Sequence, residues 1–117
     1  MANREGYGEW IDVVNDDESA TSDSFQIPRW ATFVGILCPD IDAGAVYLHV
    51  SADDSTFVPI VDPIDGDDYV LVKSGSDPCY ADISSLVAAV PVDWYLRFLH
   101  GTTQTTAAVT YKVCFRP

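Results

Sequence analysis

Residues 46–61 read Val-Tyr-Leu-His-Val-Ser-Ala-Asp-Asp-Ser-Thr-Phe-Val-Pro-Ile-Val, and this stretch decides the fold class. Apolar and other residues alternate through its first six positions, as expected of a strand with one buried face. Polar turn residues follow at 52–56, and residues 57–61 return as the second strand of a hairpin. The alternation predicts that Val46, Leu48 and Val50 face the core and that Tyr47, His49 and Ser51 face outward.

Short runs of strand-favouring residues, each bounded by turn residues, recur along the whole chain. Residues 32–38 form a continuous apolar run, typical of a strand buried on both faces, and Gly35 at its centre predicts a bulge or a close backbone approach. Residues 82–89 predict one or two helical turns with Asp82 as the cap. Further strands are expected at 9–14, 24–28, 69–73, 94–100 and 107–115. This spacing predicts an all-β protein, a two-sheet antiparallel β-sandwich of about eight strands with jelly-roll-like topology.

A chain of 117 residues has the usual size of one domain. We expect a single β-sandwich domain over residues 10–117, preceded by a flexible N-terminal arm over residues 1–9, which are polar and contain glycines. The apolar faces of the clearest strands predict the core residues Phe33, Ile36, Val46, Leu48, Val50, Leu96, Phe98, Val109, Tyr111 and Val113.

The chain is strongly acidic, with 18 acidic against 6 basic residues and a formal net charge of −12. This charge argues against nucleic acid and against an anionic membrane surface as partners, because both require clustered Lys and Arg. All of the acids lie before residue 94, whereas residues 94–117 carry Arg97, Lys112 and Arg116. Either the last two strands form a basic island, or strands from distant parts of the chain interleave and dilute the asymmetry.

The three cysteines, Cys38, Cys79 and Cys114, show neither a CxxC motif nor the Cys/His spacing of a zinc site. They fit thiols packed in or beside strands in a reducing cytosol, with one disulfide plus a free thiol as the alternative. The N-terminus has no apolar stretch typical of a signal peptide, and no run is long enough to cross a membrane. We therefore expect the protein to be made and folded in a cytoplasm.

No residue pattern predicts catalysis, so we expect no enzyme activity and no cofactor. His49 and His100 lack the neighbouring nucleophile that a catalytic base would need, and we interpret them as surface or strand-end imidazoles. The acids lie in turns, where Asp is favoured for backbone reasons. A calcium site is the strongest alternative at Asp62, Asp65, Asp67 and Asp68, but the spacing is not that of an EF-hand and a solvated acidic loop is favoured.

The chain carries more large aromatic residues than a small sandwich core needs, including three Trp and six Tyr. Tyr, Trp and Arg dominate protein–protein interfaces, whereas exposed aromatics also serve as platforms for sugars. We favour the interface interpretation. The predicted interface residues are Tyr7 and Trp10 in or beside the arm, Arg29 and Trp30 at a sheet edge, and Tyr95 and Arg97 as a second patch.

Four segments between residues 23 and 115 together resemble a known group of proteins. The hairpin at 46–61 fits the pattern V-S-x-D-G/D-x-x-F-x-P/D-Φ, and residues 94–102, Trp-Tyr-Leu-Arg-Phe-Leu-His-Gly-Thr, are similar to Φ-R-Φ-x-S-G-T. Phe25-Gln-Ile-Pro and Asp82-Ile-Ser-Ser-Leu fill the corresponding lead and turn. The chain departs from the pattern at His100, where a serine is commoner, and in its acidity. With these features the chain resembles small structural proteins of tailed bacteriophages, encoded among the head and neck genes.

The resemblance implies a non-enzymatic virion protein: a capsid decoration or cement protein that stabilises the head through protein–protein contacts. It implies the major capsid protein or other virion subunits as partners, a homo-oligomer, and a location in the virion after assembly in the host cytoplasm. Two alternatives stay open. One is a head–tail neck or tail-associated component, and the other is a carbohydrate-binding β-sandwich module.

Overall fold

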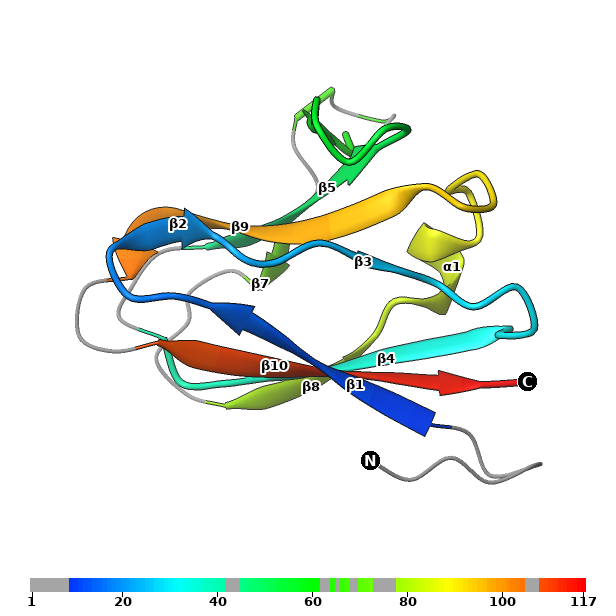
Figure 1. Cartoon of the computed structure of the whole chain (residues 1–117), viewed down its shortest axis with the longest axis horizontal. Helices are drawn as coiled ribbons and strands as arrows, with labels where there is room; N and C mark the ends of the chain where they lie inside the picture. Colours follow the sequence, from blue (N-terminus) through cyan, green and yellow to red (C-terminus); the bar gives the residue numbers. More distant parts are fainter. Residues whose placement is uncertain are drawn as a thin grey trace.

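The computed structural model describes residues 9–41, 45–61, 64, 66, 67, 70–72, 78–104 and 108–117. In this part of the chain, ten β-strands form two stacked sheets, and one short helix, α1, lies at one end of the stack (Figure 1). The strands are β1 (Glu9–Asn15), β2 (Ser19–Thr21), β3 (Phe25–Gln26), β4 (Phe33–Cys38), β5 (Val46–Ser51), β6 (Val58–Pro59), β7 (Val70–Val72), β8 (Cys79–Asp82), β9 (Tyr95–Gln104) and β10 (Val109–Arg116). The helix is α1 (Ser84–Val87).

The strand order is that of a jelly roll. One sheet has the order β1-β10-β4-β8, and the other has the order β2-β9-β5-β6, with β3 also paired to β9 and β7 also paired to β5. β2 and β3 are thus two halves of one edge strand, and β6 and β7 are two halves of the opposite edge. Counted in this way, eight strands run 1-8-3-6 in one sheet and 2-7-4-5 in the other, as in a double-Greek-key jelly roll. The predicted antiparallel β-sandwich is confirmed.

Two strands were not expected from the sequence. Ser19 begins β2 between the strands predicted at 9–14 and 24–28, because its backbone pairs with Gln104 at the end of β9. The buried side chain of Asn15 closes the turn from β1 by donating hydrogen bonds to the carbonyls of Asp16 and Ser19 at 3.0 and 2.8 Å. β8 shows no clear alternation and forms because it pairs with β4 along four residues. In addition, Glu9, which was assigned to the arm, belongs to β1, and the rest of the arm lies outside the described residues.

The core lies between the two sheets and contains all but two of the residues predicted for it. The exceptions, Phe33 and Val109, are half-buried. Phe33 lies on the outer face of β4, where the Arg116 guanidinium is 5.4 Å from its ring centroid. The expectation that residues 32–38 are buried on both sides was therefore wrong: Val34, Ile36 and Cys38 face the core, while Leu37 is exposed.

The close backbone approach predicted at Gly35 is present. A Cβ atom at Gly35 would lie 2.0 Å from the hydroxyl oxygen of Tyr80, so the Tyr80 ring rests directly on the glycine backbone. Gly35 and Tyr80 both lie on the outer face of the first sheet, away from the core.

Ser51 lies opposite Tyr95 on the outer face of the second sheet, as the alternation predicts, yet its side chain is only 1% exposed. Its hydroxyl donates to Oδ1 of Asp53 at 2.8 Å and accepts from the Asp53 N–H at 3.2 Å. The same Asp53 oxygen accepts the N–H groups of Ser55 and Thr56, each at 3.0 Å. Ser51 is thus enclosed by the turn that it helps to form, and the turn brings Phe57 back over the outer face of β9.

Candidate functional site

The most prominent surface feature is at the end of the sandwich where the chain passes from β8 through α1 to β9. Figure 1 shows α1 between β9 and β4 at this end. The Ser84 hydroxyl fixes the start of the helix, because it accepts the backbone N–H of Val34 at 2.9 Å and donates to Asp82 Oδ1 at 2.6 Å. Asp82 also accepts the Ser84 N–H at 3.0 Å, and these bonds lower the pKa of its carboxyl group. Asp82 was predicted to be the N-cap residue of this helix, but the N-cap is Ile83 and Asp82 lies one position before it.

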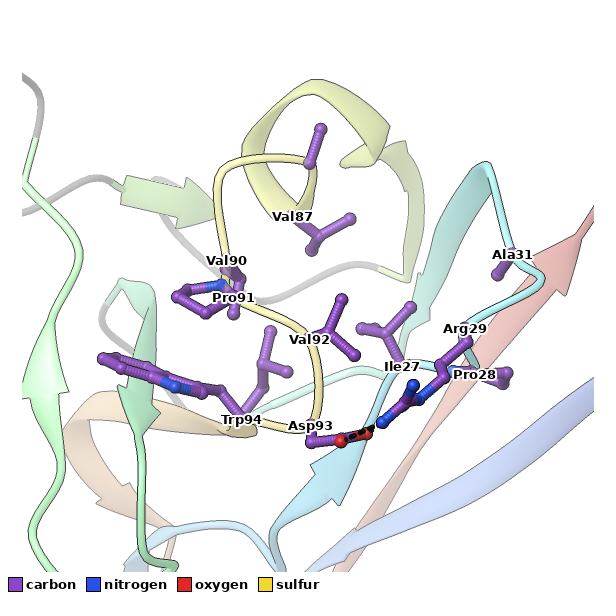
Figure 2. A pocket seen from close by; sticks show the side chains of 12 residues that line it. Ile27, Pro28, Arg29, Ala31, Val87, Val90, Pro91, Val92, Asp93 and Trp94 are labelled. Atoms are coloured by element: carbon purple, nitrogen blue, oxygen red, sulfur yellow. Dashed lines mark hydrogen bonds and ion pairs between the residues drawn. The ribbon is translucent and has the colours of Figure 1, made fainter.

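A first hollow lies between this connection and the segment that follows β3. Its volume is about 170 Å³, and its lining combines apolar side chains with the charged side chains of Arg29 and Asp93. Figure 2 shows the side chains of Ile27, Val87 and Val92 pointing toward one another in this space. Leu96, the second residue of β9, also lines this hollow.

An ion pair closes the rim of the first hollow. The Arg29 guanidinium contacts the Asp93 carboxylate through Nε and Nη2, as the dashed lines in Figure 2 show. The hydrogen bond to Asp93 and its charge raise the pKa of Arg29. Gln26 Nε2 also donates to the Asp93 carbonyl at 2.9 Å. Because both charged side chains are exposed, the pair positions the turn more than it stabilises the fold.

A second, larger hollow lies on the other side of the same connection. It has a volume of about 530 Å³ and is lined by Val50, Ile60, Val61, Ser85, Leu86, Ala89, Val90, Pro91 and Trp94. Val90, Pro91 and Trp94 line both hollows, so they form a ridge between them. Two of the lining residues stay largely exposed, since Val61 is 46% and Val92 62% accessible to solvent. Trp30, in the turn between the lining residues Arg29 and Ala31, is 44% exposed. We call this region, residues 27–31, 60–61 and 85–94, the apolar end.

The structure places two of the predicted interface residues at the apolar end. Arg29 and Trp30 lie in the exposed turn before β4, and Arg29 contacts Asp93. Trp10 is half-buried on the outer face of the other sheet, opposite Cys114 of β10. Tyr7 lies outside the described residues.

The second predicted patch is on the outer face of β9. Tyr95 and Arg97 are both half-buried and lie two positions apart, so their side chains leave the same face of the strand. The Arg97 guanidinium stacks on the ring of Phe57, 4.1 Å from its centroid. Arg97 is therefore engaged within the molecule, in a cation–π contact with the turn after β5.

The ridge formed by Val90, Pro91 and Trp94 was not predicted from the sequence. The sequence did contain one signal for it: residues 88–92 are all apolar, although they lie in a turn, where polar residues are usual. Trp94 was noted as an aromatic residue, but nothing in the sequence placed it next to Ile60 and Val61, more than 30 positions earlier.

The described residues contain no group of three or more His, Cys, Asp or Glu that could hold a metal ion. Of the four carboxylates considered for calcium, Asp62, Asp65 and Asp68 lie outside the described residues. His100 was expected at the surface or a strand end, but it is 2% exposed in the middle of β9, and its Nε2 lies 2.5 Å from the Tyr111 hydroxyl. His100 lies two positions beyond the core residue Phe98 and therefore on the inward side of β9, and the strand continues past its predicted end at residue 100 to Gln104.

The basic residues near the C-terminus are dispersed by the topology. β10 lies between β1 and β4, and Lys112 Nζ donates to Asp12 Oδ1 at 2.9 Å. Arg97 and Arg116 stack on Phe57 and Phe33. Interleaving of distant strands thus accounts for the charge asymmetry. No helix in the described part of the chain is long and apolar enough to cross a membrane.

Comparisons with protein-family models, curated proteins and solved structures find no match to this chain.

Proposed function

We propose that this protein is a non-enzymatic structural protein of a tailed-bacteriophage virion that decorates the capsid and stabilises the head through protein–protein contacts. The apolar end carries the proposal. Exposed Val61 and Val92 line two hollows that share Val90, Pro91 and Trp94, and exposed Trp30 lies in the turn whose residues Arg29 and Ala31 line the first hollow. Contiguous exposed apolar surface of this kind is typical of a site that another protein covers.

The charge distribution supports protein contact at this end. The whole chain has a net charge of −12, yet among the described residues the charged side chains that line the two hollows are Arg29 and Asp93 alone, and they form an ion pair with each other. A partner that docks here meets little net charge, while the acidic remainder of the surface repels other copies and particles. The apolar end is therefore the surface on which a partner can dock, because the acidic surface elsewhere repels other acidic molecules.

The fold is compatible with this proposal and with its main alternative. Jelly rolls occur in viral capsid proteins and also in lectins, so topology alone does not choose between them. The chemistry of the larger hollow favours protein over sugar. In the part of the chain that the structure describes, Ser85 is the one polar side chain in this lining apart from the indole N–H of Trp94. Sugar binding requires several convergent hydrogen-bonding groups, which this lining does not supply.

Binding experiments with matched variants test the proposal. Trp30→Ala removes an exposed aromatic side chain at the apolar end, and Tyr80→Ala removes one on the outer face of the first sheet. We expect the wild-type protein to cosediment with assembled heads of its phage, and Trp30→Ala to weaken binding on the order of tenfold or more. Tyr80→Ala should retain near-wild-type binding, and circular dichroism should show both variants folded.

Two further measurements separate the alternatives. Cosedimentation with isolated neck or tail complexes, but not with heads, would move the protein to the neck or tail. A monomer in analytical ultracentrifugation that binds a glycan array and ignores all virion parts would overturn the virion proposal. The genes adjacent to this one provide an independent test: capsid, portal or terminase genes support the proposal, and glycan-degrading genes contradict it.

A further inference from the structure

Two of the three cysteines lie directly opposite each other at the end of a strand pair. Cys38 is the last residue of β4 and Cys79 the first of β8, and the antiparallel register makes them Cα partners. The two thiols are also close enough that Cys79 contributes to the raised pKa of the Cys38 thiol. The sequence separates these residues by 41 positions, so only the jelly-roll pairing of β4 with β8 brings them together.

This position meets the geometric requirement for a disulfide. Directly opposed residues in antiparallel strands have Cα atoms about 4.5–5.5 Å apart. Disulfide-bonded cysteines have Cα separations of about 4.4–6.8 Å. Opposed side chains also leave the same face of the sheet, so the two sulfur atoms point the same way.

The two thiols differ in access to solvent. Cys79 is exposed, whereas Cys38 is buried among the core residues. Burial, together with the neighbouring Cys79 sulfur, raises the pKa of the Cys38 thiol to about 12. An external reagent therefore reacts with Cys79 first. Cys38 stays protonated and becomes the second thiol of the exchange.

We propose that Cys79 and Cys38 form a thiol–disulfide exchange site, in which a small-molecule disulfide such as glutathione disulfide converts the pair into a reversible cross-strand disulfide. The inference is independent of the proposed virion function. It requires the exposed thiol, the buried partner and the β4–β8 register, and no other group.

The exchange proceeds in two balanced steps. The Cys79 thiolate attacks one sulfur of the small disulfide, forming a mixed disulfide and releasing one small thiolate, which takes up a proton. Cys38 then loses its proton and its sulfur attacks Cys79 Sγ, breaking the mixed disulfide and releasing the second small thiol. Two protein thiols are oxidised, and one small disulfide is reduced to two thiols.

The disulfide would link the edge strand β8 covalently to β4. β8 is the last strand in the order β1-β10-β4-β8, and in the described part of the chain it pairs only with β4. A covalent link at one end of the pair removes fraying there and restricts the unfolded chain. The site remains reduced in a reducing compartment and closes in an oxidising one.

Cys114 provides a matched control within the same sheet. It pairs with Gly35, three positions from Cys38, and therefore lies on the opposite face of the sheet. Cys114 is half-buried, so it is also partly accessible to reagents. An exchange reaction governed by simple exposure would modify Cys114 as well as Cys79, whereas the proposed site joins Cys38 to Cys79.

The test is incubation of the full chain with glutathione disulfide, followed by tryptic mapping without reduction. Cleavage after Lys and Arg places the cysteines on separate peptides, 30–73, 74–97 and 113–117. We expect peptides 30–73 and 74–97 to be linked in the wild type and in Cys114→Ser. Cys38→Ser should instead retain glutathione on Cys79, and Cys79→Ser should retain two free thiols.

Thermal unfolding gives a second readout. The closed wild type should melt roughly 5–15 °C above its reduced form, and dithiothreitol should reverse the increase. Cys79→Ser, a surface change, should show no such increase and keeps the comparison valid if the core variant Cys38→Ser does not fold. Stable glutathione on wild-type Cys79 without closure, a link to Cys114, disulfide-linked dimers or three unreacted thiols would each overturn the proposal.

Discussion

The rings of Phe98 and Tyr111 stack with their centroids 4.2 Å apart, and each ring comes from a different sheet. Phe98 also contacts Phe25, at 5.4 Å between centroids, and Tyr111 reaches the buried imidazole of His100. Both stacked rings have no measurable exposure. This contact joins the two layers of the sandwich at the centre of the core.

Removal of one of these rings should strongly destabilise the fold. Phe98→Ala should lower the free energy of unfolding by about 3–5 kcal/mol, because it leaves a cavity and removes the ring stack. Leu48→Ala, at the neighbouring core position of β5, should cost about 2–5 kcal/mol. Urea unfolding measures both. Leu37→Ala, at an exposed position of β4, is the control, and equal losses in all three variants would contradict the assigned faces.

Ser22 lies between β2 and β3, where the edge strand is interrupted, and its hydroxyl takes the place of a backbone carbonyl as hydrogen-bond acceptor for β9. Its buried hydroxyl accepts the backbone N–H of Phe98 at 2.9 Å and donates to the Asp23 carbonyl at 2.9 Å. Ser22→Ala should cost about 1–3 kcal/mol, since it leaves the Phe98 N–H without an acceptor. Ser85→Ala, an exposed site on α1, should change stability by less than about 0.5 kcal/mol. Rapid amide exchange at Phe98 in the Ser22 variant would locate the loss.

Stability of the reduced protein should fall in alkaline solution. Burial raises the pKa of Cys38 to about 12 and also raises the pKa of Tyr111 well above its usual value of 10.0. The unfolded chain ionises these groups near their ordinary pKa values, whereas the folded chain keeps them neutral. Their contribution is therefore complete below about pH 9 and is lost as the pH rises toward 12.

Urea titrations of the reduced protein between pH 7 and pH 11 measure this loss. Cys38→Ala removes one of the two groups and should flatten the decline. Cys114→Ala removes a less buried thiol, whose pKa is also raised by burial, and should flatten it less. A free energy of unfolding that stays constant from pH 8 to pH 11 would show that neither buried group is protected from ionisation.

The Asp53 turn should contribute stability that disappears in acid. The pKa of Asp53 is lowered by hydrogen bonds from the Thr56 N–H, the Ser51 hydroxyl and the Ser55 N–H. A lowered pKa means that the contribution is present above the ordinary value near 3.8 and is lost as the pH falls through the folded-state pKa. Asp53→Asn keeps a side-chain acceptor but removes the charge.

The difference in stability between wild type and Asp53→Asn should accordingly be largest near pH 6 and shrink below pH 4. Asp54→Asn is the control, because Asp54 has a positive φ of 61°, which Asn tolerates, and lies next to Asp53. A gap that stays unchanged down to pH 2 would argue against the charged hydrogen bonds as its source.

The sequence by itself determined the sheet structure. Alternation in residues 46–51 and the polar turn after them are local signals, because side chains of a strand point to opposite faces in turn whatever the partner strand is. The same periodicity identified Val46, Leu48 and Phe98 as core residues.

Tertiary structure alone decided which distant segments meet. β8 has a weak local pattern and becomes a strand because β4 supplies its hydrogen-bonding partners. The pairing of Cys38 with Cys79 and the arrangement of Trp94 beside Val61 depend on segments more than 30 residues apart. The contact between the His100 imidazole and the Tyr111 hydroxyl likewise joins strands of two different sheets. The local periodicity of a strand does not indicate which distant segment it will contact. That choice depends on how the two sheets pack to bury their apolar faces.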